Sequence, residues 1–189
     1  MKILCTEYNA AGEAAIVPVG DDVLLRNNDD FYAPDLGVHW SAVPQLVVRL
    51  SKLGKFVSER FAERYYEEVG VGIRFYADDY EQELTAKGLP AVVASSFVNS
   101  AAISPLYPIA ECGDMAYTFL VNGEKVFETS VDHQLMGIPR LVSLASEFHT
   151  LKIGDFLYCG NPYRYANLKA GDRLQISFCG CMVMDFKMK

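Results

Sequence analysis

Residues Pro44–Tyr76, PQLVVRLSKLGKFVSERFAERYYEEVGVGIRFY, carry the strongest fold signals of the chain. The segment begins with the apolar, β-branched run Pro44–Leu50 and ends with a second such run, Val71–Tyr76, and both runs predict strands. Between them Ser58 suits a helix N-cap, apolar residues follow at helical spacing, and Gly70 is placed to end the helix. The segment therefore predicts a strand, a helix and a second strand.

Shorter signals surround this segment. Further strands are predicted at Met1–Cys5, Phe156–Cys159 and Leu174–Phe178, and further helices from Asp78 to Leu84 and from Pro139 to Phe148. Asn122-Gly123 stands between two apolar runs and predicts a two-residue hairpin, and another turn is expected at Gly180. Many short strands, few helices and no regular strand–helix alternation predict an α+β fold that is mainly β, with peripheral helices. No linker or repeat divides residues 1–189, so we expect a single domain.

Composition excludes several function classes. The chain has 17 Lys and Arg against 24 Asp and Glu, a formal charge of −7, which disfavours a nucleic-acid partner. Apolar runs such as Leu89–Phe97 are interrupted by Pro90 and Ser95, so no membrane span is expected. Glu7 and Glu13 interrupt any apolar core of a signal peptide. These features predict a cytoplasmic protein.

The cysteines and histidines form no recognisable site in the sequence. An odd number of cysteines in a chain of this size predicts reduced thiols. The five are Cys5, Cys112, Cys159, Cys179 and Cys181. Cys179-Gly180-Cys181 supplies too few ligands for a closed zinc site, and the three histidines are far apart in the sequence. We therefore expect structural roles for these residues.

Several segments, in the same order along nearly the whole chain, resemble the fumarylacetoacetate hydrolase family. They are Met1–Asn9 (MKILCTEYN), Val48–Ala77, Leu89–Pro105, Val121–Glu124 (VNGE), Thr150–Asp155 (TLKIGD), Cys159–Pro162 (CGNP) and Leu168–Asp172. The resemblance implies a mixed β-roll and a homodimer. It also implies a magnesium or manganese site used to break or rearrange carbon–carbon bonds in 2-oxo acids.

The resemblance places the family's metal ligands, two glutamates and one aspartate, on residues that cannot replace them. Anchored on Leu46–Arg49, the glutamate positions fall on Val43 and Gln45, and the aspartate position falls on Arg74. A shifted register puts Ser41 at the first position, again without a carboxylate. Divalent cations of this type prefer anionic oxygen ligands, and a guanidinium repels them. We therefore expect no metal cofactor, unless a carboxylate of Asp78 or Asp79 reaches the site.

Arg74 has two interpretations. Its guanidinium can hold a substrate carboxylate through a bidentate pair of hydrogen bonds, with Arg49 lining the same pocket. Alternatively it is an arginine at the surface or core edge that pairs with Asp78 or Asp79. The first interpretation predicts a small carboxylate ligand.

Other family positions supply the remaining candidates. Glu13 stands where the resemblance places a histidine that activates water, so it is either a general base or a solvated side chain. Glu81 replaces a glutamine, and Ser95 replaces an active-site lysine. Asn161 replaces a threonine and either lines the pocket or forms a turn before Pro162. Cys159, at the same pocket wall, is either a nucleophile or a small buried residue.

Two hypotheses follow for function. In the first, the chain is a catalytically degenerate family member, a pseudoenzyme or carboxylate-binding protein that keeps the fold and the homodimer. In the second, it is a hydrolase or isomerase with a rebuilt site that acts on a 2-oxo or 2-hydroxydienoic acid, with Glu13 and Glu81 as candidate catalytic residues. The bulky run Tyr163–Tyr165 is expected to narrow the mouth of the pocket.

Overall fold

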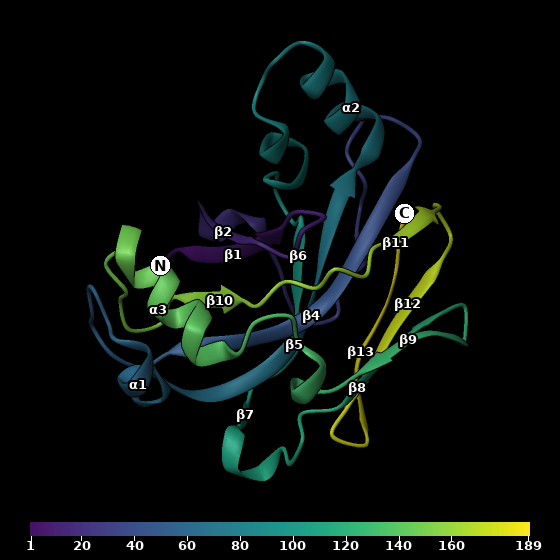
Figure 1. The fold of residues 1–189 in the computed structure, drawn as a ribbon. Helices are drawn as coiled ribbons and strands as arrows, with labels where there is room; N and C mark the ends of the chain where they lie inside the picture. Colours follow the sequence, from purple (N-terminus) through teal and green to yellow (C-terminus); the bar gives the residue numbers. More distant parts are fainter.

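The computed structural model describes all residues 1–189 and consists of two β-sheets with three α-helices packed around them (Figure 1). The larger sheet has nine strands in the order β2-β1-β10-β4-β5-β6-β3, with β11 beside β4 and β7 beside β5. The smaller sheet has the order β13-β12-β8-β9. This arrangement confirms the predicted α+β, mainly β fold class.

The element bounds follow the chain. The strands are β1 Ile3–Tyr8, β2 Ala14–Val19, β3 Leu24–Leu25, β4 Trp40–Leu50, β5 Tyr66–Ala77, β6 Ala101–Ile103, β7 Tyr107–Pro108, β8 Tyr117–Val121, β9 Glu124–Thr129, β10 Phe156–Tyr158, β11 Tyr165–Leu168, β12 Arg173–Phe178 and β13 Cys181–Lys187. The α-helices are α1 Glu59–Ala62, α2 Asp78–Ala86 and α3 Ile138–Phe148, and short 3₁₀ turns include Glu63–Tyr65 and Ala91–Ser95. None of the helices combines the length and apolar character needed to cross a membrane.

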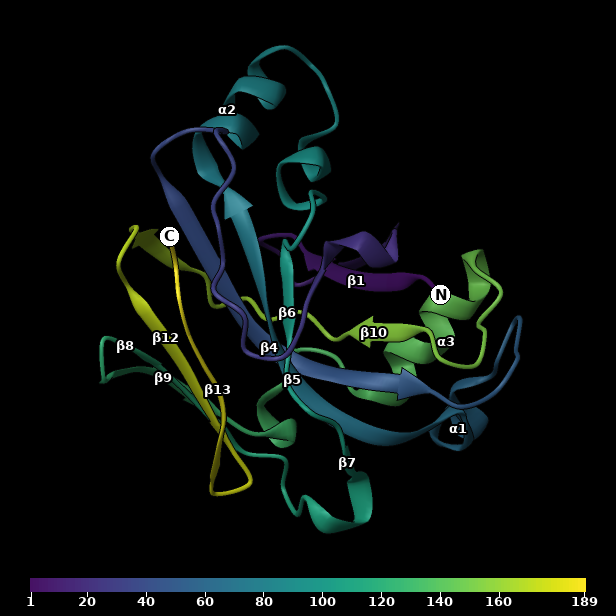
Figure 2. The same cartoon turned by 180° about the vertical axis from the view of Figure 1, so that it is seen from behind.

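The two longest strands, β4 and β5, form the antiparallel centre of the large sheet (Figure 2). Pro44 lies in the middle of β4, between the part that pairs with β11 and the part that pairs with β10. A proline has no backbone N–H to donate. On this side of β4 no strand pairs with Pro44, so no hydrogen bond of the sheet is lost there. The Pro44 carbonyl is used by side chains, since it accepts hydrogen bonds from Tyr117 Oη and Asn161 Nδ2.

The two faces of β4 and β5 have different neighbours. Alternate residues of a strand point to opposite faces, and directly opposed residues of paired strands point to the same face. One face packs into a core of 36 buried residues shared with the small sheet and α3. The other face carries a core of nine buried residues, including Cys5, Val47 and Tyr158. Gly72 lies on this second face, where an added Cβ would stand 2.6 Å from the Tyr158 ring.

The helix predicted from Ser58 to Val69 is wrong over most of its length. Helix α1 covers only Glu59–Ala62, a 3₁₀ turn follows, and β5 begins at Tyr66. Gly70 is paired with Val47 inside β5 and ends no helix. The long pairing with β4 therefore overrides the helical spacing of the apolar residues.

The other local predictions are confirmed. Helices α2 and α3 begin at Asp78 and Ile138, with Pro139 in the first turn of α3. Asn122 and Gly123 join β8 to β9 with positive φ angles of 55° and 84°, as a two-residue hairpin turn requires. The turn at Gly180 joins β12 to β13.

Candidate functional site

A cavity of about 420 Å³ opens at the α2 end of the large sheet. We call it the arginine cavity, and its polar lining residues are Thr6, Glu7, Tyr8, Tyr76, Glu81, Ser95, Asn161 and Arg164. They come from β1, β5, α2, the turn Ala91–Ser95 and the loop after β10. A cavity of this size accommodates a small organic acid. Its size counts against the expectation that Tyr163–Tyr165 narrows the pocket. Of this run, Arg164 lines the cavity, whereas Tyr163 stacks on Phe127 outside it.

Arg74 lies directly behind the lining of the arginine cavity and is only 1% exposed. Its NH2 donates a hydrogen bond of 2.6 Å to the carbonyl of Ser95 and stands 3.9 Å from Oε1 of Glu7. Nε and NH1 have no hydrogen-bond partner. Burial lowers the pKa of Arg74, but the neighbouring Cys5, Tyr76 and Glu7 together raise it above its ordinary value. A cation with unused donors is therefore held beneath the cavity.

Glu7 and Tyr76 form a hydrogen-bonded pair on the cavity wall. Tyr76 Oη donates to Glu7, at 3.0 Å from Oε1 and 2.9 Å from Oε2. Burial raises the pKa of the Glu7 carboxyl, and the charge of Arg74 and the Tyr76 hydrogen bond oppose the rise. Because Glu7 keeps 32% of its side-chain surface exposed, this carboxylate remains accessible from the cavity.

Arg164 closes another side of the arginine cavity. Its NH2 pairs with Asp78 and lies 2.6 Å from Oε2 of Glu81, and its guanidinium stands 4.4 Å from the centre of the Tyr76 ring. Asp78 is therefore paired with Arg164 and not with Arg74. The interpretation of Arg74 as an arginine at the surface or core edge that pairs with Asp78 or Asp79 is therefore wrong.

The other acidic residue of that interpretation, Asp79, fixes the turn before β4. Its Oδ2 accepts hydrogen bonds from the backbone N–H groups of Val38 and His39, at 2.7 and 3.0 Å. These two bonds are the largest causes of the lowered pKa of Asp79. Asp79 does not line the arginine cavity.

The three positions that the resemblance assigns to metal ligands do lie together. Val43 is paired with Arg74 across β4 and β5, and Gln45 is paired with Gly72 two residues along, so all three side chains share one face. Their chemistry does not fit a divalent metal, since Val43 has no donor atom and Arg74 is a cation. The carbonyl oxygen of the Gln45 side chain is already used, accepting a bond of 2.6 Å from the Gly160 backbone.

The alternative register gives no metal ligand either. Ser41 Oγ donates to Asp78 at 2.5 Å, and Asp78 is paired with Arg164. No three His, Cys, Asp or Glu side chains in residues 1–189 are arranged to hold a metal ion.

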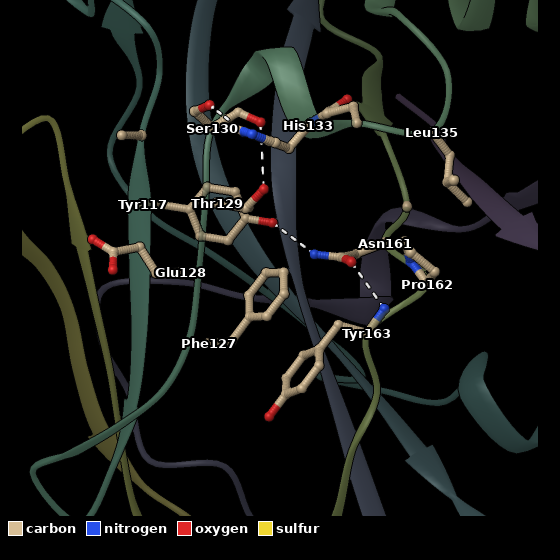
Figure 3. Close-up of a pocket in the computed structure, with 13 residues that line it drawn as sticks. Tyr117, Phe127, Glu128, Thr129, Ser130, His133, Leu135, Asn161, Pro162 and Tyr163 are labelled. Atoms are coloured by element: carbon tan, nitrogen blue, oxygen red, sulfur yellow. Dashed lines mark hydrogen bonds between the residues drawn. The ribbon is translucent and has the colours of Figure 1, made fainter.

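Asn161 lies on the wall between the arginine cavity and a second cavity of about 490 Å³ (Figure 3). We call the second one the aromatic cavity, because the rings of Tyr117, Phe127 and Tyr163 line it. Nδ2 of Asn161 donates to Pro44 and Tyr117, at 3.0 and 2.9 Å, and Oδ1 accepts a bond of 2.9 Å from the Tyr163 backbone. These contacts match the turn-forming interpretation of Asn161 and leave its side chain no free donor.

The structure brings some predicted residues to the cavity and not others. Glu81 and Ser95 line it, and Arg74 lies behind it. Glu13 is exposed in the turn between β1 and β2, where it accepts a bond of 2.7 Å from Asn9, so the solvated interpretation fits its position. Arg49 is exposed towards the other end of β4 and pairs with Glu68 at 3.1 Å.

The thiol of Cys159 is fully buried, and burial raises its pKa to about 12. A thiol in this state is a poor nucleophile, because the thiolate is the reactive form. The structure therefore favours the interpretation of Cys159 as a small buried residue.

Sequence analysis missed Glu7, Tyr76 and Arg164 as site residues. Tyr76 and Glu7 are 69 positions apart in the sequence, and Arg164 and Glu81 are 83 positions apart. The members of each pair come together only in the folded chain. One local signal was present. Glu7 follows Ile3 and Cys5 on the same face of a buried strand, where a carboxylate is unusual.

Comparison with known proteins agrees with this fold. Residues 15–188 match the family model described as fumarylacetoacetate (FAA) hydrolase C-terminal. The chain belongs to the fumarylacetoacetate hydrolase family. It is 30% identical over 148 residues to the mouse protein named oxaloacetate tautomerase FAHD1, mitochondrial, an alignment that covers 77% of this chain and 67% of the relative. It is 29% identical to oxaloacetate tautomerase YcgM of Escherichia coli over 72% of this chain and 64% of the relative.

Solved structures of the family have the same architecture. A fumarylacetoacetate hydrolase family protein from Yersinia pestis superposes with a TM-score of 0.88 at 25% identity, covering 100% of this chain and 92% of the other. Fumarylpyruvate hydrolase from Pseudomonas aeruginosa, solved with Mn²⁺ and pyruvate, shares the fold with a TM-score of 0.86 at 20% identity, over 100% and 88% of the two chains. Hydrolase and isomerase names both occur among these structural relatives.

Proposed function

We propose that this family member binds a small 2-oxo acid in the arginine cavity without a divalent metal, and that it has lost the family's metal-dependent chemistry. The observation that carries the proposal is the position of Arg74. Its guanidinium occupies the face of β4 and β5 on which the resemblance expects a metal, and two of its nitrogens have no partner. A guanidinium supplies a permanent positive charge there, so it can attract a carboxylate as a metal would.

The charge of Arg74 favours a carboxylate ligand in particular. Arg74 does not line the cavity and its two unpartnered nitrogens are buried, so it attracts an anion in the adjacent cavity by its charge and not through a direct hydrogen bond. Glu7 compensates the charge only partly, because its nearest oxygen is 3.9 Å from Arg74 and burial favours its neutral form. Arg164, by contrast, already pairs with two carboxylates, those of Asp78 and Glu81.

Calorimetric titration with oxalate, an unreactive mimic of a 2-oxo acid, tests the proposal. In the presence of a chelator the wild-type protein should bind oxalate saturably, and Arg74→Met should lose at least about tenfold in affinity, the effect of about 1.4 kcal/mol. Arg49→Met is the matched control, because it removes an exposed arginine from the neighbouring strand β4, outside the cavity. Equal binding by wild type and Arg74→Met, with both proteins folded by circular dichroism, would contradict the proposal.

A second candidate function is catalysis by a rebuilt site, as an isomerase or hydrolase of a 2-oxo acid. The observation that favours it is Glu7, a carboxylate with a raised pKa on the wall of a cavity that also holds Arg164. The names of the mouse and bacterial relatives, oxaloacetate tautomerases, point to the same class of substrate.

We propose a homodimer in the cytoplasm. Exposed apolar side chains gather where Gly54 bonds to Leu151 at 3.1 Å, and they supply a surface for a second copy. These residues are Leu53, Phe56, Phe148 and Ile153, between 68% and 73% exposed. Sedimentation equilibrium tests the dimer, and a monomer at all concentrations would contradict it.

A further inference from the structure

We infer that the arginine cavity selects a 2-oxo acid that carries a hydrogen-bond donor, such as a hydroxyl, amide or ammonium group, in place of a second carboxylate, and that Glu7 makes this selection. The inference rests on the proposed function and names the class of ligand more narrowly. It separates this chain from the mouse and bacterial relatives, which are named after oxaloacetate, an acid with two carboxylates.

The cavity has positive charge for one ligand carboxylate only. Arg164 is paired with Asp78, and its NH2 also lies 2.6 Å from Oε2 of Glu81, so two carboxylates already meet its charge. Arg74 is the remaining guanidinium, held behind the lining by its hydrogen bond to Ser95. One cation compensates one anionic group, and a further charge that enters without a partner is costly. A second ligand carboxylate therefore has no cation left to pair with.

The carboxylate of Glu7 is free to accept a hydrogen bond from a ligand. It lines the cavity, and 32% of its side-chain surface is exposed. Its hydrogen-bond partner within the chain is the hydroxyl of Tyr76, at 3.0 Å from Oε1 and 2.9 Å from Oε2. A carboxylate can accept about four hydrogen bonds, and a single hydroxyl uses little of this capacity. Glu7 therefore presents unused lone pairs and a negative charge to the ligand.

The attractive cation and the free carboxylate lie side by side. Oε1 of Glu7 stands 3.9 Å from NH2 of Arg74. A ligand carboxylate drawn towards Arg74 therefore brings the neighbouring atoms of the same molecule next to Glu7. A hydrogen-bond donor at that place gains a charge-assisted bond to Glu7. A second carboxylate at that place is repelled by a like charge at short range.

Tyr76 keeps Glu7 in this position. The Tyr76 side chain is itself held in place, because the residue is only 7% exposed and its ring lies near two guanidinium groups. The guanidinium of Arg164 stands 4.4 Å from the ring centre and that of Arg74 stands 5.8 Å from it. Both oxygens of Glu7 are bonded to the hydroxyl of this ring. The Glu7 carboxylate is therefore fixed beside the ligand and does not turn away from a second anionic group.

The first test compares oxamate with oxalate in calorimetric titrations of the wild-type protein, with a chelator present. The two probes have the same planar skeleton, and oxamate carries an amide group in place of one carboxylate. The titrations are made at alkaline pH, where Glu7 is ionised in spite of its raised pKa. Oxamate should bind at least about tenfold more tightly, the effect of one charge-assisted hydrogen bond. Equal affinities, or tighter binding of oxalate, would overturn the inference.

The second test repeats both titrations with Glu7→Gln, which keeps the shape of the side chain and removes its charge. This variant should lose about tenfold in affinity for oxamate and gain at least about threefold in affinity for oxalate. A gain in affinity cannot arise from damage to the fold, so it separates selection from structure. Glu13→Gln makes the same chemical change in the exposed turn and should keep the wild-type preference. An unchanged ratio of the two affinities in Glu7→Gln would overturn the inference.

The two proposals can fail separately. If Arg74→Met weakens the binding of both probes and Glu7→Gln changes neither affinity, the inference is overturned and the proposed function stands. If Glu7→Gln shifts the ratio and Arg74→Met has no effect, the selection by Glu7 stands and the proposed role of Arg74 is overturned. If neither probe binds to the wild-type protein, both are overturned.

Discussion

Val43 lies directly opposite Arg74 in the antiparallel pair of β4 and β5, so the two side chains face the same side of the sheet. The resemblance assigns a metal ligand to each of these two positions. A valine and a buried arginine occupy them in this chain, and Arg74 is 1% exposed. The pairing therefore puts a guanidinium, itself a cation, at a position to which the resemblance assigns a metal ligand.

Gly72 should resist enlargement because the Tyr158 ring packs against its backbone. A Cβ at this position would meet Tyr158 Cε1 at 2.6 Å and the Ala102 carbonyl at 2.7 Å. We expect Gly72→Ala to lower the free energy of unfolding by about 1–3 kcal/mol, measured by urea denaturation. Gly137→Ala is the control, since the nearest atom to its added Cβ is 3.7 Å away. Equal effects of the two substitutions would contradict the packing described here.

Replacing Asn161 should lower the stability of the fold without weakening ligand binding. Its side chain joins Pro44, Tyr117 and the backbone of Tyr163 through three hydrogen bonds of 2.9 to 3.0 Å. Asn161→Ala leaves these groups without a partner, so unfolding should become easier by about 2 kcal/mol. Oxalate binding by the folded variant should match wild type in calorimetry. A selective loss of binding with unchanged stability would assign Asn161 to the ligand instead.

The two turns that end in Gly-Asp should respond differently to the same substitution. Asp155 and Asp172 each accept a hydrogen bond from the backbone N–H of the lysine three residues earlier, at 2.9 and 2.8 Å. The Asp155 side chain is buried and also pairs with Lys2, whereas Asp172 is only half-buried. Asp155→Asn should cost about 1.5–3 kcal/mol, because the lost bonds are charge-assisted. Asp172→Asn should cost less in the same thermal unfolding experiment, and the reverse order would be inconsistent with this structure.

The raised pKa of Glu7 predicts a pH dependence of stability with a definite sign. The folded state binds the Glu7 proton more tightly than the unfolded state, in which the pKa is near 4.5. The stability linked to this proton is therefore present below that value and is lost as the pH rises through the folded-state pKa. Glu7→Gln has no such loss. In urea unfolding, its stability relative to wild type should increase as the pH rises from about 4.5 through the folded-state pKa of Glu7. A flat difference across this range would contradict the raised pKa, and Glu13→Gln gives the exposed comparison.

Local signals in the sequence predict the turns and two of the helices well. Asn122-Gly123 forms the expected hairpin because its positive φ angles suit these two residues. The helix expected before Val69 fails because Tyr66–Ala77 gains far more by pairing with β4 along its whole length. Gly70 looks like a helix terminator in the sequence, and Gly72 falls in the predicted strand Val71–Tyr76. In the sheet, they provide room for Leu106 and Tyr158.

The site was predicted less completely than the fold. The resemblance correctly groups Val43, Gln45 and Arg74 on one face, since it carries long-range information that local patterns lack. It does not indicate Glu7, which reaches the cavity through the pairing of β1, and it places Arg164 only within the run Tyr163–Tyr165 at the pocket mouth. A polar residue at an inward position of a buried strand, as at Glu7, is the signal to look for in such chains.

Metal titration tests the central claim most directly. Chelator-treated protein, freed of the chelator by dialysis, would be titrated with Mg²⁺ and Mn²⁺ in a calorimeter, with and without oxalate. We predict no saturable binding of either metal by the protein alone, and an affinity for oxalate that does not depend on metal. Saturable binding of Mg²⁺ or Mn²⁺ in the micromolar range would contradict the account, because no ligand set described here could hold the ion.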